Sequence, residues 1–180
     1  MDYRCSLTER YSPEEFARLV QFYVLDRPFD QKVEDRAKTL EGYGWKGNPQ
    51  STKLERLLLQ QSGIQQFIIL GSNSIKETLK IMKLDEEICA DHPRALLHRP
   101  TKIKLNEDGS ITRASNDNRM QCLLKNIRNG IAHGQTYIFP NGAILLEDKA
   151  DEGAVTARIL VRKESLLNWI DVIQAGSQKT

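Results

Sequence analysis

Cysteines, long apolar runs and an excess of charge of one sign are all scarce in this chain of 180 residues. The three cysteines lie far apart and form no CxxC pattern, which indicates free thiols in a reducing compartment. The three histidines do not fall at ligand spacing with the cysteines, so no metal site is expected. No glycine-rich phosphate loop is present either, and we expect no cofactor.

Features of membrane and secreted proteins are also missing. The longest apolar runs, Phe67–Leu70 among them, are far shorter than the roughly 20 residues that a membrane-spanning helix needs. The N-terminal segment MDYRCSLTER contains no apolar run and does not resemble a signal peptide. We therefore expect a soluble, cytoplasmic protein with no membrane partner. The net charge of +2 neither indicates nor excludes a nucleic-acid partner.

Helical signals cover much of the chain. Ser12-Pro13-Glu14-Glu15 is a capping box with proline at the first helical position, and it predicts a helix that runs to about Asp26. Apolar residues recur at helical spacing from Leu54 to Cys89, which predicts helix in one, two or three pieces. A last helix is expected from about Lys163 to Gln174.

Strand signals are confined to two places in the second half of the chain. Lys102–Leu105 and Ile111–Thr112 alternate around a polar turn and predict a hairpin. Asn141-Gly142 between apolar runs predicts a second hairpin, and Val155–Val161 alternates as a third strand of that element. The expected fold is therefore mainly α, a helical bundle with a small antiparallel β element between the last two helices.

The length of the chain favours one domain that spans residues 1–180. Within it we expect a core at about 50–180 that carries the chemical motif, preceded by an N-terminal helical extension at about 1–49. A glycine-rich loop lies near the end of that extension and contains Trp45, for which anchoring in the core is favoured over stacking on a base.

One further helix, expected from about Asp117 to His133, carries the unusual residues. Its apolar side chains cluster on one side at roughly 100° per residue and predict a buried stripe, formed by Met120, Leu123, Leu124, Ile127 and Ile131. The opposite side carries Lys125, Asn126, Asn129 and His133, and Arg128 flanks this outward face. No carboxylate occurs between Asp117 and Glu147, so the face is cationic and rich in amides.

Three residues at the end of this helix, Gly130, His133 and Arg128, allow more than one interpretation. Gly130 costs about 1 kcal/mol relative to alanine in a helix interior, and one reason to keep it is the close approach of another backbone or of a ligand. His133-Gly134 is a usual helix C-terminus, because a histidine cation favours the helix dipole and glycine adopts the left-handed conformation. Arg128 by itself is more often solvated or ion-paired than functional.

The combination Arg128-Asn129-Gly130-Ile131-Ala132-His133 resembles the Arg-polar-spacer-His motif of the HEPN superfamily (higher eukaryotes and prokaryotes nucleotide-binding domains). The hairpin and helix that follow are similar to those of stand-alone bacterial members. The resemblance implies an α-helical bundle and a metal-independent endoribonuclease. It further implies a dimer in which two motifs face each other, and a role in toxin–antitoxin, antiviral defence or stress systems with an antitoxin or defence-system protein as partner.

The residue types suit metal-free cleavage of RNA independently of that resemblance. Histidine can accept or donate a proton near neutral pH, and arginine matches phosphate oxygens with a fixed fork of donors. We therefore expect His133 and Arg128 to be catalytic, Asn129 to support them, and Lys125 and Asn126 to bind substrate. One histidine cannot act as base and acid at once, so a homodimer follows from the mechanism as well.

Two other functions have less support from the sequence. The second hypothesis is a non-catalytic HEPN-like interaction module that binds RNA, nucleotide or a protein partner. A DNA-binding regulator has little support, because no clear helix-turn-helix with a basic recognition helix is present. The basic segment from Arg94 to Lys104 could follow an RNA backbone, but a solvated loop and an edge strand are favoured there.

Overall fold

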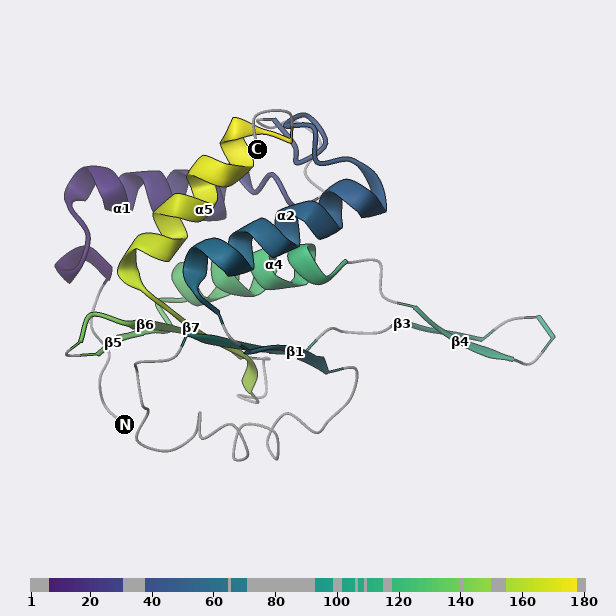
Figure 1. The fold of residues 1–180 in the computed structure, drawn as a ribbon. Coiled ribbons are helices and arrows are strands. Elements are labelled where there is room, and N and C mark those ends of the chain that lie inside the picture. The colour runs from purple at the N-terminus through teal and green to yellow at the C-terminus, as the bar shows by residue number, and fades with distance from the viewer. Residues whose placement is uncertain are drawn as a thin grey trace.

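A five-stranded mixed sheet forms the base of the fold, and the described helices lie on one side of it (Figure 1). The structure is a computed structural model. It describes residues 7–30, 38–64, 66–70, 93–98, 102–105, 107–108, 110–114, 118–139, 141–149 and 155–177.

The strand order in the sheet is β1-β2-β7-β6-β5. Strands β1 and β2 are parallel, with Gln66 opposite Arg94, and every other neighbouring pair is antiparallel. The five strands are β1 (Gln66–Leu70), β2 (Arg94–His98), β5 (Thr136–Ile138), β6 (Ile144–Lys149) and β7 (Val155–Val161).

The expected helical bundle is wrong, because the fold is α/β: the described residues form this mixed sheet together with four α-helices. The apolar run at Phe67–Leu70 belongs to strand β1 and not to a helix. Arg94–His98 is an interior strand between β1 and β7, where a loop or edge strand was favoured. Short apolar runs fit a buried strand as well as a helix, so periodicity alone could not separate the two.

Local signals placed the other elements well. The capping box of Ser12 is present, and α1 (Pro13–Leu19) continues as a π-helical segment, η2 (Val20–Asp26). A short 3₁₀ segment, η1 (Leu7–Glu9), precedes α1. The last helix, α5 (Lys163–Ala175), and both hairpins are confirmed. The hairpin of β3 (Lys102–Leu105) and β4 (Ile111–Ala114) extends away from the rest of the described chain (Figure 1).

The helix expected from Leu54 to Cys89, in one, two or three pieces, is present only in part of the described residues. Helix α2 (Gly47–Ser62) ends at Gly63, which adopts the left-handed conformation, and strand β1 follows. The remainder of the expected region, from residue 71 to Cys89, lies outside the described residues.

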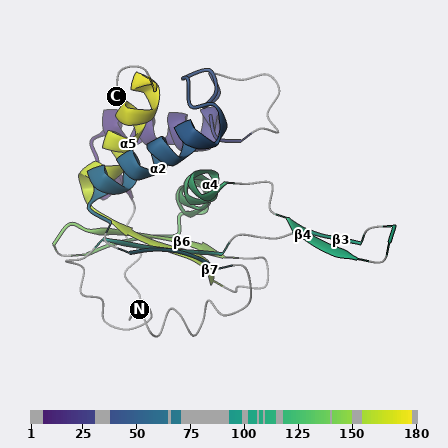
Figure 2. The same ribbon diagram turned by 45° about the vertical axis from the view of Figure 1, so that its right-hand side comes forward.

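Helix α4 (Arg119–Ala132) lies between the sheet and an outer layer formed by α1, α2 and α5 (Figure 2). One hydrophobic core joins these layers and includes Leu19 and Phe22 from the N-terminal segment, Leu58 from α2 and Trp169 from α5. The predicted apolar stripe of α4 is buried in this core. A helix covered on two sides has little free surface, and this limits which of its polar residues a ligand can reach.

Trp45 confirms the structural interpretation of the glycine-rich loop. The residue is buried, and its indole N–H donates a hydrogen bond to the backbone oxygen of Ile173 at 3.0 Å. None of the helices in the described ranges has both the length and the apolar character required to cross a lipid bilayer.

Candidate functional site

Helix α4 carries the residues expected to be functional, and its own sequence determines where it begins and ends. Asn118 is the N-cap: its side-chain oxygen accepts from the backbone N–H of Gln121 at 2.8 Å, and the Gln121 side chain accepts from the backbone N–H of Asn118 at 3.0 Å. At the other end His133 is the C-cap and Gly134 has a φ of 62°. The expected role of His133-Gly134 as a helix terminus is therefore confirmed.

A chain of hydrogen bonds links the end of α4 to strand β6. The guanidinium Nη1 of Arg128 donates to Oδ1 of Asn129 at 2.9 Å, and Nδ2 of Asn129 donates to Oδ2 of Asp148 at 3.0 Å. Arg128 and Asn129 are half-buried, whereas Asp148 is only 8% exposed. Arg128 Nε is buried and has no hydrogen-bond partner among the residues that the structure describes.

Asp148 is a site residue that the sequence reasoning did not include. It follows the apolar residues of β6, and side chains along a strand alternate between the two faces of the sheet. Leu146 faces α4, so the residue two positions later faces α4 as well. The alternation along β6 is visible in the sequence. It points to Asp148 only once α4 is known to pack on β6.

Gly130 explains how α4 comes close enough to β6 for this contact. A Cβ at Gly130 would lie 3.2 Å from Cβ of Leu146 and 3.3 Å from the backbone oxygen of Glu147. The expected reason for this glycine, close approach of another backbone, is confirmed. Asn129 is the residue before Gly130. The close approach therefore brings Asn129 within hydrogen-bonding distance of Asp148, which follows Glu147 in β6.

Replacing Gly130 by valine should therefore lower the free energy of unfolding by about 1–3 kcal/mol, because the added side chain overpacks the contact between helix and sheet. The measurement is urea denaturation followed by circular dichroism. Ala132→Val is the matched control, since Ala132 is exposed in the same helix and its replacement tests only the lower helix propensity of valine. Equal losses in the two variants would contradict the packing argument.

His133 is exposed and lies on the same end of α4 as Arg128 and Asn129. Within the described part of the chain the hydrogen bonds of Arg128 and Asn129 run along the helix surface toward β6, and none joins them to the His133 side chain. The structure thus connects two of the three predicted catalytic residues directly and leaves the third open to solvent.

The two expected substrate-binding residues differ in their surroundings. Asn126 is buried, and its Nδ2 donates to the backbone oxygen of Cys122 at 2.8 Å. Its expected place on an outward face is wrong, because α4 is covered by the sheet on one side and by helices on another. Lys125 is half-buried and lies about one turn before Arg128 on α4.

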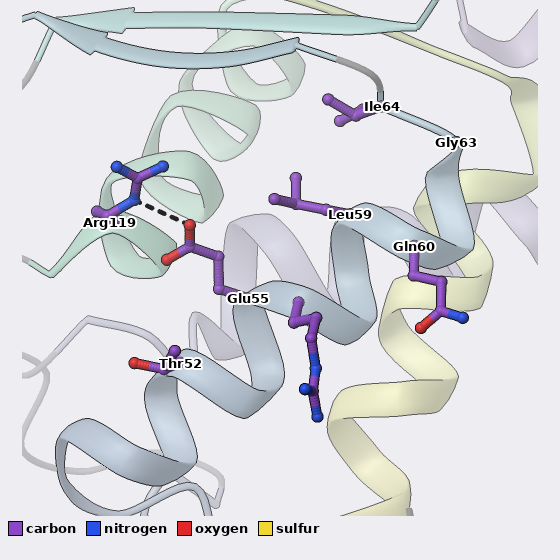
Figure 3. A pocket seen from close by; sticks show the side chains of 8 residues that line it. Thr52, Glu55, Leu59, Gln60, Gly63, Ile64 and Arg119 are labelled. Carbon is purple, nitrogen blue, oxygen red and sulfur yellow. Dashed lines mark hydrogen bonds and ion pairs between the residues drawn. The ribbon is translucent and has the colours of Figure 1, made fainter.

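Two pockets lie elsewhere in the described structure. A shallow groove of about 730 Å³ follows one face of α2 from Thr52 to Gly63 (Figure 3). Arg119 forms one wall, where its Nε contacts Glu55 Oε1 at 2.9 Å and its guanidinium stacks over the ring of Phe67.

The second pocket, of about 290 Å³, lies at the start of α5 and is lined by three cations, Arg10, Arg162 and Lys163. Lys163 is already engaged, because its Nζ lies 3.4 Å from Oε2 of Glu15 and over the ring of Tyr11. Neither pocket contains a residue predicted to be catalytic or substrate-binding.

The described residues contain no group of three or more His, Cys, Asp or Glu side chains placed to hold a metal ion. Comparison of the chain with protein-family models, with curated proteins and with solved structures found no match.

Proposed function

We propose that the protein is a metal-independent endoribonuclease whose Arg128, His133 and Asn129 act at the C-terminal end of α4. The observation that carries the proposal is the hydrogen-bonded chain Arg128–Asn129–Asp148, which holds a half-exposed guanidinium at the same helix end as an exposed histidine. A guanidinium held in this way is suited to phosphate, because its donors form a fixed fork.

The proposed reaction is transesterification within RNA. The 2′-oxygen attacks phosphorus and the bond from phosphorus to the 5′-oxygen breaks, which leaves a 2′,3′-cyclic phosphate and a 5′-hydroxyl. One proton leaves the 2′-hydroxyl for a base, and one proton reaches the 5′-oxygen from an acid. His133 supplies this proton transfer, and Arg128 stabilises the negative charge that develops on the phosphate oxygens.

The stoichiometry of that reaction favours a homodimer. Each chain contributes one His133, whereas the reaction needs a base and an acid at the same time, so two copies divide the roles. Lys125 supports binding of the RNA backbone as an additional cation on α4. Asn126 has no part in this proposal because it is buried.

The cellular setting rests on the resemblance of the motif to that of HEPN proteins. A cytoplasmic role in a toxin–antitoxin, defence or stress system, with an antitoxin or defence protein as partner, stays a prediction. The small number and wide spacing of the cysteines support the reducing location.

The test is cleavage of a labelled RNA of mixed sequence in excess EDTA. Wild type should cut it and leave 2′,3′-cyclic phosphate ends, while His133→Ala and Arg128→Ala should each lower the rate by about 100-fold or more. Arg56→Ala is the matched control: it removes an exposed arginine from α2 and should retain the wild-type rate. A wild-type enzyme that cuts no RNA at any concentration, or variants that cut as fast as wild type, would refute the nuclease.

The second candidate, a binding module without catalysis, is favoured by one observation. The backbone of His133 forms the C-cap of α4, and within the described residues no hydrogen bond joins its side chain to Arg128 or Asn129. Under this alternative, wild type would bind RNA in a gel-shift or anisotropy experiment without cutting it. Arg128→Ala would then weaken binding, and His133→Ala would leave binding unchanged.

A further inference from the structure

Asp148 is a buried carboxylate whose described partner is a neutral amide and not a cation. The residue is 8% exposed, and Nδ2 of Asn129 donates to its Oδ2 at 3.0 Å. Taking a carboxylate out of water is costly unless other groups compensate its charge. The described part of the chain contains no ion pair that involves Asp148.

Two cations of the same sheet contact the neighbouring carboxylate, Glu147, instead. Lys149 Nζ lies 2.8 Å from Oε1 of Glu147, and Arg158 Nε lies 2.7 Å from its Oε2. Adjacent residues of a strand point to opposite faces of the sheet, so Glu147 and Asp148 face away from each other. Arg158, which is opposite Glu147 in the register of β6 and β7, therefore belongs to the face away from α4.

The positive group that the hydrogen bonds connect to Asp148 is Arg128, and the connection passes through the amide of Asn129. A carboxylate only accepts hydrogen bonds and a guanidinium only donates them. An amide between the two satisfies both in one orientation, with its nitrogen toward Asp148 and its oxygen toward Arg128. A flipped amide would oppose oxygen to oxygen and nitrogen to nitrogen.

We propose that Asp148 is the positioning residue of the site: its carboxylate sets the orientation of the Asn129 amide, and the amide oxygen in turn holds the Arg128 guanidinium for a phosphate. Asp148 touches no reacting atom. It acts from a strand, and strands and helices hold side chains more accurately than loops do. Binding of phosphate by the Arg128 guanidinium rests on the proposed function. The orientation of the Asn129 amide by Asp148 is independent of that function.

The first arm of the test is independent of RNA. NMR of isotope-labelled protein measures solvent exchange of the Asn129 side-chain amide protons and rotation of the Arg128 guanidinium. In Asp148→Ala the amide protons should exchange at least about 10-fold faster and the guanidinium should rotate faster, because both hydrogen bonds weaken. In Asp148→Asn the change should be smaller but measurable, since a charge-assisted bond becomes a neutral one.

The second arm measures cleavage kinetics. Asp148→Ala should lower kcat by about 10- to 100-fold with little change in KM, because the phosphate still binds but the guanidinium is misplaced. Asp148→Asn should recover part of this loss, since it keeps an acceptor oxygen at the same position. Asp171→Asn is the matched control, because it removes an exposed aspartate, the ion-pair partner of Arg18, and should change neither arm.

The outcomes separate the two proposals. If wild type cuts no RNA, the nuclease fails and the NMR arm alone decides the role of Asp148. Unchanged Asn129 exchange and Arg128 rotation in a folded Asp148→Ala variant would overturn the positioning role. If that variant does not fold, Asp148→Asn decides, and unchanged signals there would overturn it as well. Equal loss of kcat in Asp148→Asn and Asp148→Ala, with unchanged Arg128 rotation, would indicate a structural role only.

Discussion

Replacing Trp169 by alanine is expected to lower the free energy of unfolding by about 3–5 kcal/mol, the range for removing a large aromatic side chain from a packed core. Trp169 is fully buried on α5 and belongs to the core that joins the sheet to the helices. Its indole N–H donates to the backbone oxygen of Leu58 at 2.7 Å, which links α5 to α2. The loss would combine a cavity with the loss of this hydrogen bond between the two helices.

Chemical denaturation of two further variants separates these contributions. Trp169→Phe keeps much of the ring volume and removes the hydrogen bond, so it should lose less stability than Trp169→Ala. Leu25→Ala is the control for removing a large apolar side chain from the surface, because Leu25 is 46% exposed. Leu25→Ala should lower the free energy of unfolding much less than Trp169→Ala does. Similar decreases at the two positions would contradict the assignment of Trp169 to the core.

Arg158→Met is expected to lower the free energy of unfolding by about 3 kcal/mol. Glu147 is only 3% exposed and contacts Arg158 at 2.7 Å and Lys149 at 2.8 Å. Removing one partner of a buried ion pair leaves a charge without adequate compensation, which typically costs about 3–5 kcal/mol. Lys149 remains in contact with Glu147, so the expected loss lies at the lower end of that range.

The double variant Glu147→Leu, Arg158→Met is the test of this reasoning. Because it removes the buried charge together with its partner, its stability should return close to that of wild type. The interaction is measured by a double-mutant cycle in urea. A double variant that is as unstable as Arg158→Met would show that the loss comes from packing of the arginine stem and not from the unpaired carboxylate.

The sheet illustrates where sequence patterns are ambiguous. The hairpin turn at Asn141-Gly142 was readable, because the residues that determine it are adjacent and its strands follow directly. The sequence alone did not identify strand β1, because its partner β2 lies much later in the chain. The two strands pair in parallel, with Gln66 opposite Arg94. An apolar run of four or five residues carries no periodicity that separates such a strand from a helix turn.

The candidate site was readable only in part for a similar reason. Arg128, Asn129 and His133 lie within one helix, so their helical spacing placed them at one end of it. Asn126 also lies in that helix, but whether it faces solvent or protein depends on what covers α4. Asp148 belongs to a strand, and the sequence contains no local signal that joins it to Asn129.

By itself, the sequence determined the start of α1, the approximate ends of α4 and α5, the buried stripe of α4 and the two hairpins. These features depend on caps, turns and side chains a few residues apart, so local physics is sufficient for them. The tertiary structure decided that β1 and β2 join the sheet and that α4 lies between layers. It also decided that Asn129 contacts Asp148. That contact requires β6 to pack closely against α4, and the missing side chain of Gly130 allows this close packing.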